Sequence, residues 1–274
     1  MDKSIEIYLY TLFFIFYLRN DALEEIEGNI PEPAVPNDQY DSSHTLIYTI
    51  SSLSNANTFC NTYNHNNGYN GLKIGQRIQI NDGLYNRTWY IAGFDCEYNR
   101  KTANRTSFNN GYGICLIPTE TVTSGIWNDT YSVEYEFGYI NSTIHTSTLS
   151  TVASNLQNVL GSHLINRTVY LSSRNSGVMA SIETKTTAYC TLMSEVQVLG
   201  FHYDPNSADI GEANYLLPLF YYTGHWISSS YWLRSFGIGN GSNQLAGRTI
   251  DYKGKLSSVT STKYSGVRPM IYIR

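Results

Sequence analysis

The chain has 274 residues and a net charge of −4, only 15% of its residues are charged, and 24 tyrosines raise its aromatic fraction to 14%. A chain of this length can bury a full hydrophobic core, and one large domain with a small appendage is the simplest division. We find no cluster of lysines and arginines, which excludes nucleic acid as the expected partner. The many tyrosines, glycines and small polar residues favour a β-rich structure with many turns.

An apolar segment begins the chain. Residues 5–18 are almost all apolar or aromatic, but about 14 residues is short of the ~20 that a bilayer-spanning helix needs. The segment is also a poor signal peptide, since Asp2 lies before it and no small-x-small cleavage site follows. We therefore expect residues 1–44 to form an apolar arm with a proline-containing linker, and residues 45–274 to form one domain.

The four cysteines are widely spaced and include no CxxC pair. Disulfides need an oxidising compartment, and no clear export signal directs the chain to one. The sequence therefore predicts four buried free thiols: Cys60, Cys96, Cys115 and Cys190.

Short strands and two helices are predicted in the first two thirds of the chain. Leu53 to Tyr63 has helical spacing of its apolar residues, and Ser51 or Ser52 can cap it. Apolar residues from Ile144 to Leu160 predict a second helix, capped by Ser142 or Thr143 and closed by Gly161. Alternation and turn residues predict strands over 45–50, 72–80, 89–95 and 112–117. Residues 170–172 follow the second helix and are left unassigned.

Two later segments are less regular. Residues 191–200 mix apolar and polar positions, so both strand and helix remain open there. Residues 216–220 are short and apolar, and Pro218 interrupts them. Two short helices among many short strands and long loops predict an α+β domain.

The C-terminal segment 231–274 has two apolar ends around a polar middle. Residues 231–235 are bulky and are expected to be buried. Residues 266–274 alternate as a terminal strand, with Val267, Ile271 and Ile273 on one face. The middle lacks a core-forming run, and a polar, aromatic-containing loop on a rigid frame is typical of binding loops.

Eight motifs in this order resemble a family of phage and prophage proteins with a C-type-lectin-like domain, often described as tail- or head-fibre components. The resemblance covers residues 45–274 and extends to the variable proteins of diversity-generating retroelements. The motifs are TWYIAGFD (88–95), GYGICLIP (111–118), YINSTIHTSTL (139–149), NVLGSHLINRTVYLSS (158–173), LMSEVQVLG (192–200), GEANYLLPLF (211–220), YWLRS (231–235) and GVRPMIYIR (266–274).

The resemblance implies a C-type-lectin-like fold of short antiparallel strands, two helices and long loops. The N-terminal arm, residues 1–44, lies outside the resemblance, and its anchoring role is inferred from its composition alone. The resemblance implies that residues 236–264 form the region that differs between family members. It also implies a location on the surface of a bacteriophage virion. Four residues match the frame positions of the family: Trp232, Arg234, Val267 and Arg268.

Residues in the middle region combine aromatic rings, amides and cations, as binding surfaces do. We take nine of them as candidate ligand contacts, with Tyr221, Tyr222 and Trp226 as a possible rim. An ordinary solvated loop and a contact with a neighbouring subunit are the alternatives. The nine are Phe236, Ile238, Asn240, Asn243, Gln244, Arg248, Tyr252, Lys253 and Tyr264.

Metal and catalytic sites are not predicted. Residues 127–129 spell the WND triplet of calcium-binding lectins and 212–214 resemble their E-P-N loop, but the two occur in the reverse order. The six histidines lack zinc-ligand spacing, although His145 and His163 flank the second helix. No nucleophile or nucleotide-binding motif is present, so we expect no catalytic residue, no cofactor and no enzyme activity.

Arg234 and Arg268 lie within apolar flanks. Each is expected to be a buried arginine with carboxylate and carbonyl partners and not a ligand contact. The sequence leaves three carboxylate partners open: Glu195, Asp209 and Glu212.

Three functional interpretations follow. The leading one is a head- or tail-fibre-type virion protein that attaches to other virion proteins through residues 1–44 and binds a host cell-surface glycan or protein. The alternative is a purely structural protein of the capsid or tail, and the third is an exported bacterial adhesin. An exposed apolar arm is a liability on a monomer, so we expect a homo-oligomer, a trimer before a dimer by analogy with fibres.

Overall fold

Two β-sheets and a few short helices make up the part of the chain that the structure describes, so the α+β class is confirmed. The computed structural model describes residues 40–84, 86–101, 107–129, 139–175, 178–200, 215–222, 227–238 and 245–274, all within one compact unit that begins at Asn37. Of the arm and linker predicted over residues 1–44, residues 1–39 lie outside the described residues. No helix among the described residues has both the length and the apolar character needed to cross a membrane.

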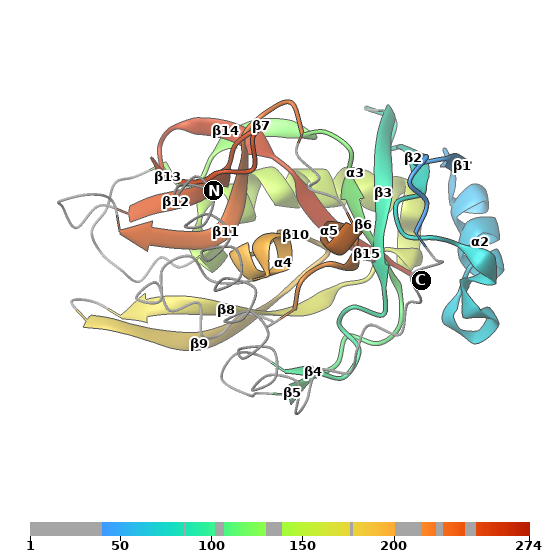
Figure 1. The fold of residues 1–274 in the computed structure, drawn as a ribbon, viewed down its shortest axis with the longest axis horizontal. Coiled ribbons are helices and arrows are strands. Elements are labelled where there is room, and N and C mark those ends of the chain that lie inside the picture. The colour runs from blue at the N-terminus through green and yellow to red at the C-terminus, as the bar shows by residue number, and fades with distance from the viewer. Residues whose placement is uncertain are drawn as a thin grey trace, which may run out of the picture. The chain divides into compact units, whose positions relative to one another are not determined.

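The first sheet has six strands, which lie in the centre and on the right of Figure 1. All neighbouring pairs are antiparallel except the first, which is parallel. The predicted strands at 45–50, 89–95 and 112–117 are confirmed, whereas only the end of 72–80 is a strand. In spatial order the strands are β1 (Leu46–Ile50), β2 (Arg77–Asn81), β3 (Asn86–Phe94), β6 (Ile114–Pro118), β15 (Pro269–Ile273) and β10 (Cys190–Leu192).

The second sheet has five strands and contains most of the C-terminal segment. The chain passes directly from the first sheet to the second between β6 and β7, and back between β14 and β15. These two crossings lie side by side because Val122 N donates to Val267 O at 2.8 Å. In spatial order the strands are β13 (Leu256–Thr260), β12 (Leu245–Ile250), β11 (Tyr231–Ile238), β14 (Tyr264–Val267) and β7 (Thr123–Ile126).

Two predictions for the C-terminal segment are wrong. Its middle is not one loop, because it contains all of β12 and β13. Its end is not one alternating strand, because β14 and β15 belong to different sheets and every residue of β15 is buried. A strand inside a sheet that is covered on both faces needs no alternation of apolar and polar residues.

Two hairpins project from the sheets. Residues 170–172, which the sequence left unassigned, are part of a long hairpin of β8 (Arg167–Asn175) and β9 (Val178–Ala188), seen at the lower left of Figure 1. A short hairpin joins β4 (Arg100–Lys101) to β5 (Ser107–Phe108). Serine and threonine fill much of the long hairpin, which is why the sequence pattern did not indicate its length.

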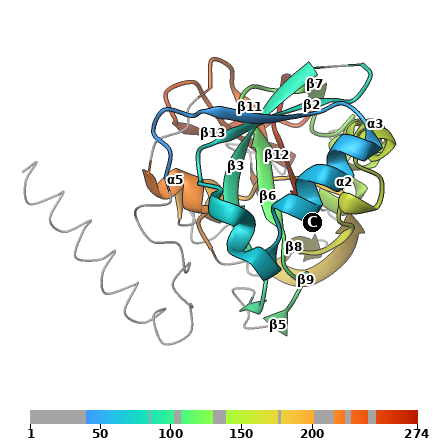
Figure 2. The same cartoon turned by 90° about the vertical axis from the view of Figure 1, so that its right-hand side faces the viewer.

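Both predicted helices are confirmed. Ser52 caps α2 (Leu53–Thr62) by accepting from Asn55 N at 3.2 Å. The second helix begins as a π-helical segment (Ile144–Leu149), continues as α3 (Ser150–Leu160) and ends at Gly161, whose φ is 55°. Figure 2 shows α2 and α3 next to each other at one side of the first sheet.

The remaining helices are short. The open segment 191–200 forms the end of β10 and then α4 (Glu195–Leu199), whose cap Ser194 accepts from Gln197 N at 3.2 Å. The segment around Pro218 is α5 (Pro218–Tyr222), with Pro218 as its first residue, where a proline costs no hydrogen bond. The core between these elements also holds the four cysteines as free, buried thiols, as predicted.

An ion pair between Arg167 and Glu97 lies inside this core. Arg167 Nη1 is 2.6 Å from Glu97 Oε1, and both side chains are almost completely buried. Arg167 Nη2 donates to Thr191 Oγ1 at 3.0 Å, and the guanidinium carbon is 4.4 Å from the ring centroid of Tyr272. Burial acts to lower the pKa of Arg167, but the charge and hydrogen bond of Glu97, together with Tyr272 and Tyr215, raise that pKa above its ordinary value, so the arginine remains charged.

Replacing Arg167 by methionine is expected to lower the free energy of unfolding by about 3–5 kcal/mol, because the Glu97 carboxylate would lose its charge partner in the core. Urea unfolding of the full chain measures this. The double variant Arg167→Met, Glu97→Leu removes both charges and is expected to be more stable than the single variant. A single variant as stable as the wild type would contradict the role of the pair.

Candidate binding surface

Two tryptophans fix the inner face of the C-terminal segment. Trp232 in β11 is fully buried, and its Nε1 donates to Gly125 O at 2.8 Å in β7. Trp127, also fully buried, donates through Nε1 to Leu233 O at 3.2 Å. Gly247 in β12 leaves room for both rings, since a Cβ there would lie 2.6 Å from the Trp232 ring. The sheet is therefore anchored by ring-to-backbone hydrogen bonds from its buried side.

Arg234 and Arg268 are buried and donate to carbonyls. Arg234 Nη1 donates to Leu192 O at 3.1 Å, which ties β11 to β10. Arg268 lies where the chain passes from β14 to β15, and its Nε donates to Pro118 O at 3.0 Å while its guanidinium carbon is 5.2 Å from the Tyr231 ring centroid. The prediction that both are buried with carbonyl partners is confirmed. Val267, the fourth frame residue, is fully buried as well.

Arg248 is also part of the interior. We expected it to contact a ligand, but it is 7% exposed, and its Nε lies 3.3 Å from Oε1 of Glu195 in α4. Its Nη1 also donates to Ser258 Oγ on the neighbouring strand. Glu195 is one of the three carboxylates proposed as arginine partners, and the other two, at 209 and 212, lie outside the described residues. Because Arg248 is used to join α4 to the second sheet, we do not keep it among the surface contacts.

Three of the candidate residues are at the surface, in the turns on either side of β13. Tyr252 is 58% exposed, and Lys253 Nζ lies 5.3 Å from its ring centroid. Asp251 orders this turn, because its Oδ1 accepts from Lys253 N and from Lys255 N, each at 2.8 Å. Tyr264, the first residue of β14, is 75% exposed. The rings of Tyr252 and Tyr264 therefore lie at the surface of the C-terminal segment, whose inner side is anchored by the buried tryptophans.

The other candidates are not described in full. Phe236 and Ile238 belong to β11, but their side chains lie outside the description. At the expected rim, Tyr221 is exposed and Tyr222 stacks on Tyr40 with ring centroids 4.6 Å apart. The remaining expected residues lie outside the described part of the chain: Asn240, Asn243, Gln244 and Trp226.

The WND triplet at residues 127–129, which resembles a calcium-site motif, packs within the fold. Asn128 is buried, and its Oδ1 accepts from Thr143 Oγ1 at 3.1 Å. The E-P-N-like residues 212–214 lie outside the described residues. Within the described part of the chain, no three histidine, cysteine or acidic side chains come together to hold a metal ion.

The two histidines beside the second helix do not face each other. His163, which follows α3, bonds to Arg274 O through Nδ1 and to Asn57 Oδ1 through Nε2, each at 2.6 Å. His145 lies at the other end, in the π-helical segment, with its ring centroid 4.8 Å from that of Tyr139. Burial lowers the pKa of His145, so its neutral form is favoured in the folded chain.

A second group of surface rings was missed by the sequence analysis. His65, Tyr112 and Tyr98 form one stack, although they come from three places in the chain. Asp95 binds the outer histidine, with His65 Nδ1 2.8 Å from Asp95 Oδ2. No motif joins these residues in the sequence, and the tyrosines stood out only as part of a high overall count.

Comparisons of the chain with protein-family models, with curated proteins and with solved structures found no match.

Gly247→Ala is expected to lower the free energy of unfolding by about 1–3 kcal/mol, because the added methyl group would overlap the Trp232 ring. The matched control is Ser229→Ala in an exposed turn, for which a change within about 0.5 kcal/mol is expected. Thermal or urea unfolding measures both. Equal stabilities of the two variants would show that Trp232 and Gly247 are not in tight contact.

Stability is expected to fall as the pH drops below 6.5, partly because of His145. Its folded pKa is lowered, so the unfolded chain takes up the proton first and stability present above the unfolded pKa is lost on acidification. His145→Gln is expected to lose less stability between pH 7.5 and pH ~5 than the wild type. Urea unfolding at both pH values measures the difference, and identical losses in the two proteins would rule His145 out as a contributor.

Proposed function

We propose that this chain is a phage virion surface protein of the head- or tail-fibre type, with a C-type-lectin-like domain that binds a host cell-surface glycan or protein. One observation carries the proposal: within residues 231–274, the frame side chains are buried while Tyr252 and Tyr264 are 58% and 75% exposed. The α+β class with two neighbouring helices and two mostly antiparallel sheets supports the lectin-like fold. The sequence motifs of residues 45–274 support the family.

The exposed turns have the chemistry of a contact surface. Tyrosine offers a large, rigid area at low cost in side-chain entropy, and Lys253 adds a cation beside Tyr252. The hydrogen bonds that Asp251 accepts from Lys253 N and Lys255 N hold the turn in one conformation, so less entropy is lost when a partner binds. No step of this recognition requires a metal or a reaction.

Residues 1–44 would join the protein to other virion proteins and to copies of itself, as a trimer or dimer. Several copies on one particle would raise a modest affinity per domain by about 10²–10⁴. In the alternative function, the same exposed tyrosines would pack against another capsid or tail protein and recognise nothing on the host.

Binding of the labelled full chain to a panel of bacterial cells tests the proposal. The double variant Tyr252→Ala, Tyr264→Ala is expected to bind at least about tenfold more weakly, since two exposed rings are removed from the contact. The matched control is Leu84→Ala, which removes an apolar side chain of 68% exposure from a turn elsewhere in the chain and is expected to bind as the wild type does.

Unchanged binding by the double variant would reject this surface. Failure of the wild type to bind any cells, together with burial of residues 231–274 in a reconstruction of the particle, would instead favour the assembly role.

A further inference from the structure

Strand β13 forms one edge of the second sheet. Its only neighbour among the described strands is β12, which lies beside it on the left of Figure 1. The two strands pair over all five residues of β13 without a bulge. Bulges, prolines and charged side chains commonly block the edge of a sheet, and β13 contains none of them. Its outer side is therefore suited to pair with another strand.

Backbone groups of Leu256 and Ser258 point to this open edge. Asp251 N donates to Lys255 O at 3.0 Å, which closes the turn from β12 to β13 with a bonded pair. Bonded and non-bonded pairs alternate along an antiparallel ladder, so Leu256 and Ser258 turn their N–H and C=O groups away from β12. Ser258 is also exposed. The edge therefore offers two donors and two acceptors to a partner strand.

The exposed rings of the C-terminal segment lie at the two ends of β13. Tyr252 is in the turn before the strand, and Tyr264 follows the strand after a short turn. In this second turn, Lys263 N donates to Thr260 O at 2.9 Å. The five residues of β13 span about 17 Å, and an extended segment of nine residues spans about 30 Å. Such a segment along β13 would reach an aromatic side chain at each end.

Positive charge surrounds the same edge. Lys253 and Lys255 lie in the first turn and Lys263 lies in the second, and all three side chains are exposed. Asp251 is the one acidic residue between positions 245 and 264, and its Oδ1 accepts from two backbone N–H groups of its own turn. Among the described residues, no ion pair involves any of the three lysines. The edge therefore favours a partner strand with carboxylates near both of its ends.

A second copy of the chain is not the expected occupant of this edge. Pairing two β13 strands would bring the lysines of both copies close together, and like charges on neighbouring strands are destabilising. Lysines beside an edge strand are one means by which proteins avoid such self-pairing. The same charges attract an acidic strand, so they favour a different partner over a second copy.

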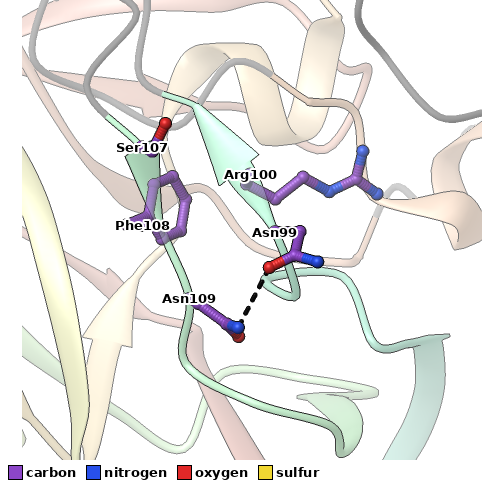
Figure 3. A pocket seen from close by; sticks show the side chains of 5 residues that line it. All are labelled: Asn99, Arg100, Ser107, Phe108 and Asn109. Atoms are coloured by element: carbon purple, nitrogen blue, oxygen red, sulfur yellow. Dashed lines mark hydrogen bonds between the residues drawn. The ribbon is translucent and has the colours of Figure 1, made fainter.

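The groove between β4 and β5 is less suited to an acidic strand. Its volume is about 380 Å³, and β4 and β5 have only two residues each. It has one cationic side chain, that of Arg100, whose Nε donates to Cys96 O at 2.9 Å. Figure 3 shows the hydrogen bond of 3.0 Å from Asn109 Nδ2 to Asn99 Oδ1. The lining residues are Asn99, Arg100, Ser107, Phe108 and Asn109.

We infer that β13 binds an extended, acidic segment of a partner protein as an added strand. Backbone groups of Leu256 and Ser258 would bond the backbone of that segment, as in other complexes formed by strand addition. Tyr252 and Tyr264 would pack on its apolar side chains, and the lysines of both turns would pair with its carboxylates. This binding mode rests on the function proposed above and narrows its partner from a glycan or protein to a protein.

Fluorescence anisotropy of labelled peptides titrated with the full chain tests this inference. The probe is the nine-residue peptide DEVTVTVED, which places β-forming residues between acidic ends. It is expected to bind with a Kd below about 1 mM, and the basic counterpart KKVTVTVKK is expected to bind at least about tenfold more weakly. The inference is overturned if the acidic peptide shows no saturable binding, or if both peptides bind equally.

Charge reversal in both turns locates the bound peptide. The double variant Lys255→Glu, Lys263→Glu is expected to raise the Kd of the acidic peptide at least about tenfold and to lower that of the basic peptide. A damaged fold would not gain affinity for the basic peptide. The matched control Lys73→Glu reverses an exposed lysine before β2 and is expected to leave both Kd values within about twofold. Equal effects of the control and the double variant would show that the peptide does not bind at β13.

Methylation of the peptide backbone tests whether the peptide binds as a strand. A strand that pairs along one edge uses the N–H groups of every second residue. DEVTVTVED is therefore methylated at the backbone nitrogen of either its fourth or its fifth residue, and one of these two peptides is expected to bind severalfold more weakly than the other. Equal Kd values for the two methylated peptides would overturn strand addition.

Cell binding separates this inference from the proposed function. If the labelled chain binds cells through Tyr252 and Tyr264 but does not bind the acidic peptide, the proposed function holds and strand addition fails. If the chain binds the acidic peptide at β13 but binds no cells, strand addition holds and host recognition fails. Unfolding curves of each variant show that the fold is retained.

Discussion

The buried pair of Arg167 and Glu97 joins two parts of the chain that lie 70 residues apart. Arg167 begins the long hairpin, and Glu97 lies in a strap, residues 95–101 and 107–113, that leaves the first sheet after β3 and returns at β6. Glu97 also accepts from Tyr215 at 3.1 Å and from Asn110 at 2.8 Å. A buried carboxylate is tolerated only when its charge and its lone pairs are satisfied, so the strap, the hairpin and the end of the sheet must close together.

Two parts of the surface, the strap and the C-terminal segment, are held by hydrogen bonds to the buried interior. The strap carries the ring stack and the groove, and it is held from below by Glu97 and by Asn110, which also bonds Thr168 through both of its side-chain polar atoms at 2.8 Å. The C-terminal segment carries Tyr252 and Tyr264, and it is held by buried tryptophans and by Arg268 at the crossing between the sheets. In the C-terminal segment these bonds are buried while the rings of Tyr252 and Tyr264 are exposed.

The sequence predicted the elements whose signals are local. Both helices follow from apolar spacing and from the caps Ser52 and Gly161, and the strand at 89–95 follows from its alternation and its preceding turn. It missed β12 and β13, since short strands rich in glycine, serine and threonine resemble loops. Arg248 was misassigned because its partner Glu195 lies on a helix far away in the chain, and a single sequence cannot show such a pair. The ring stack was missed for the same reason, as it combines His65 with residues of the strap.

If the buried ion pair holds the strap to the core, the strap and the first sheet form one cooperative unit. Native-state hydrogen exchange of the full chain measures this for amides with defined acceptors, such as Asp95 N to Gly113 O and Asn110 N to Glu97 O, each part of the strap. We expect these amides to open with the same free energy as those of β15 and β10. Exchange of the strap amides within seconds, while the strands stay protected, would contradict the claim that the buried ion pair holds the strap to the core.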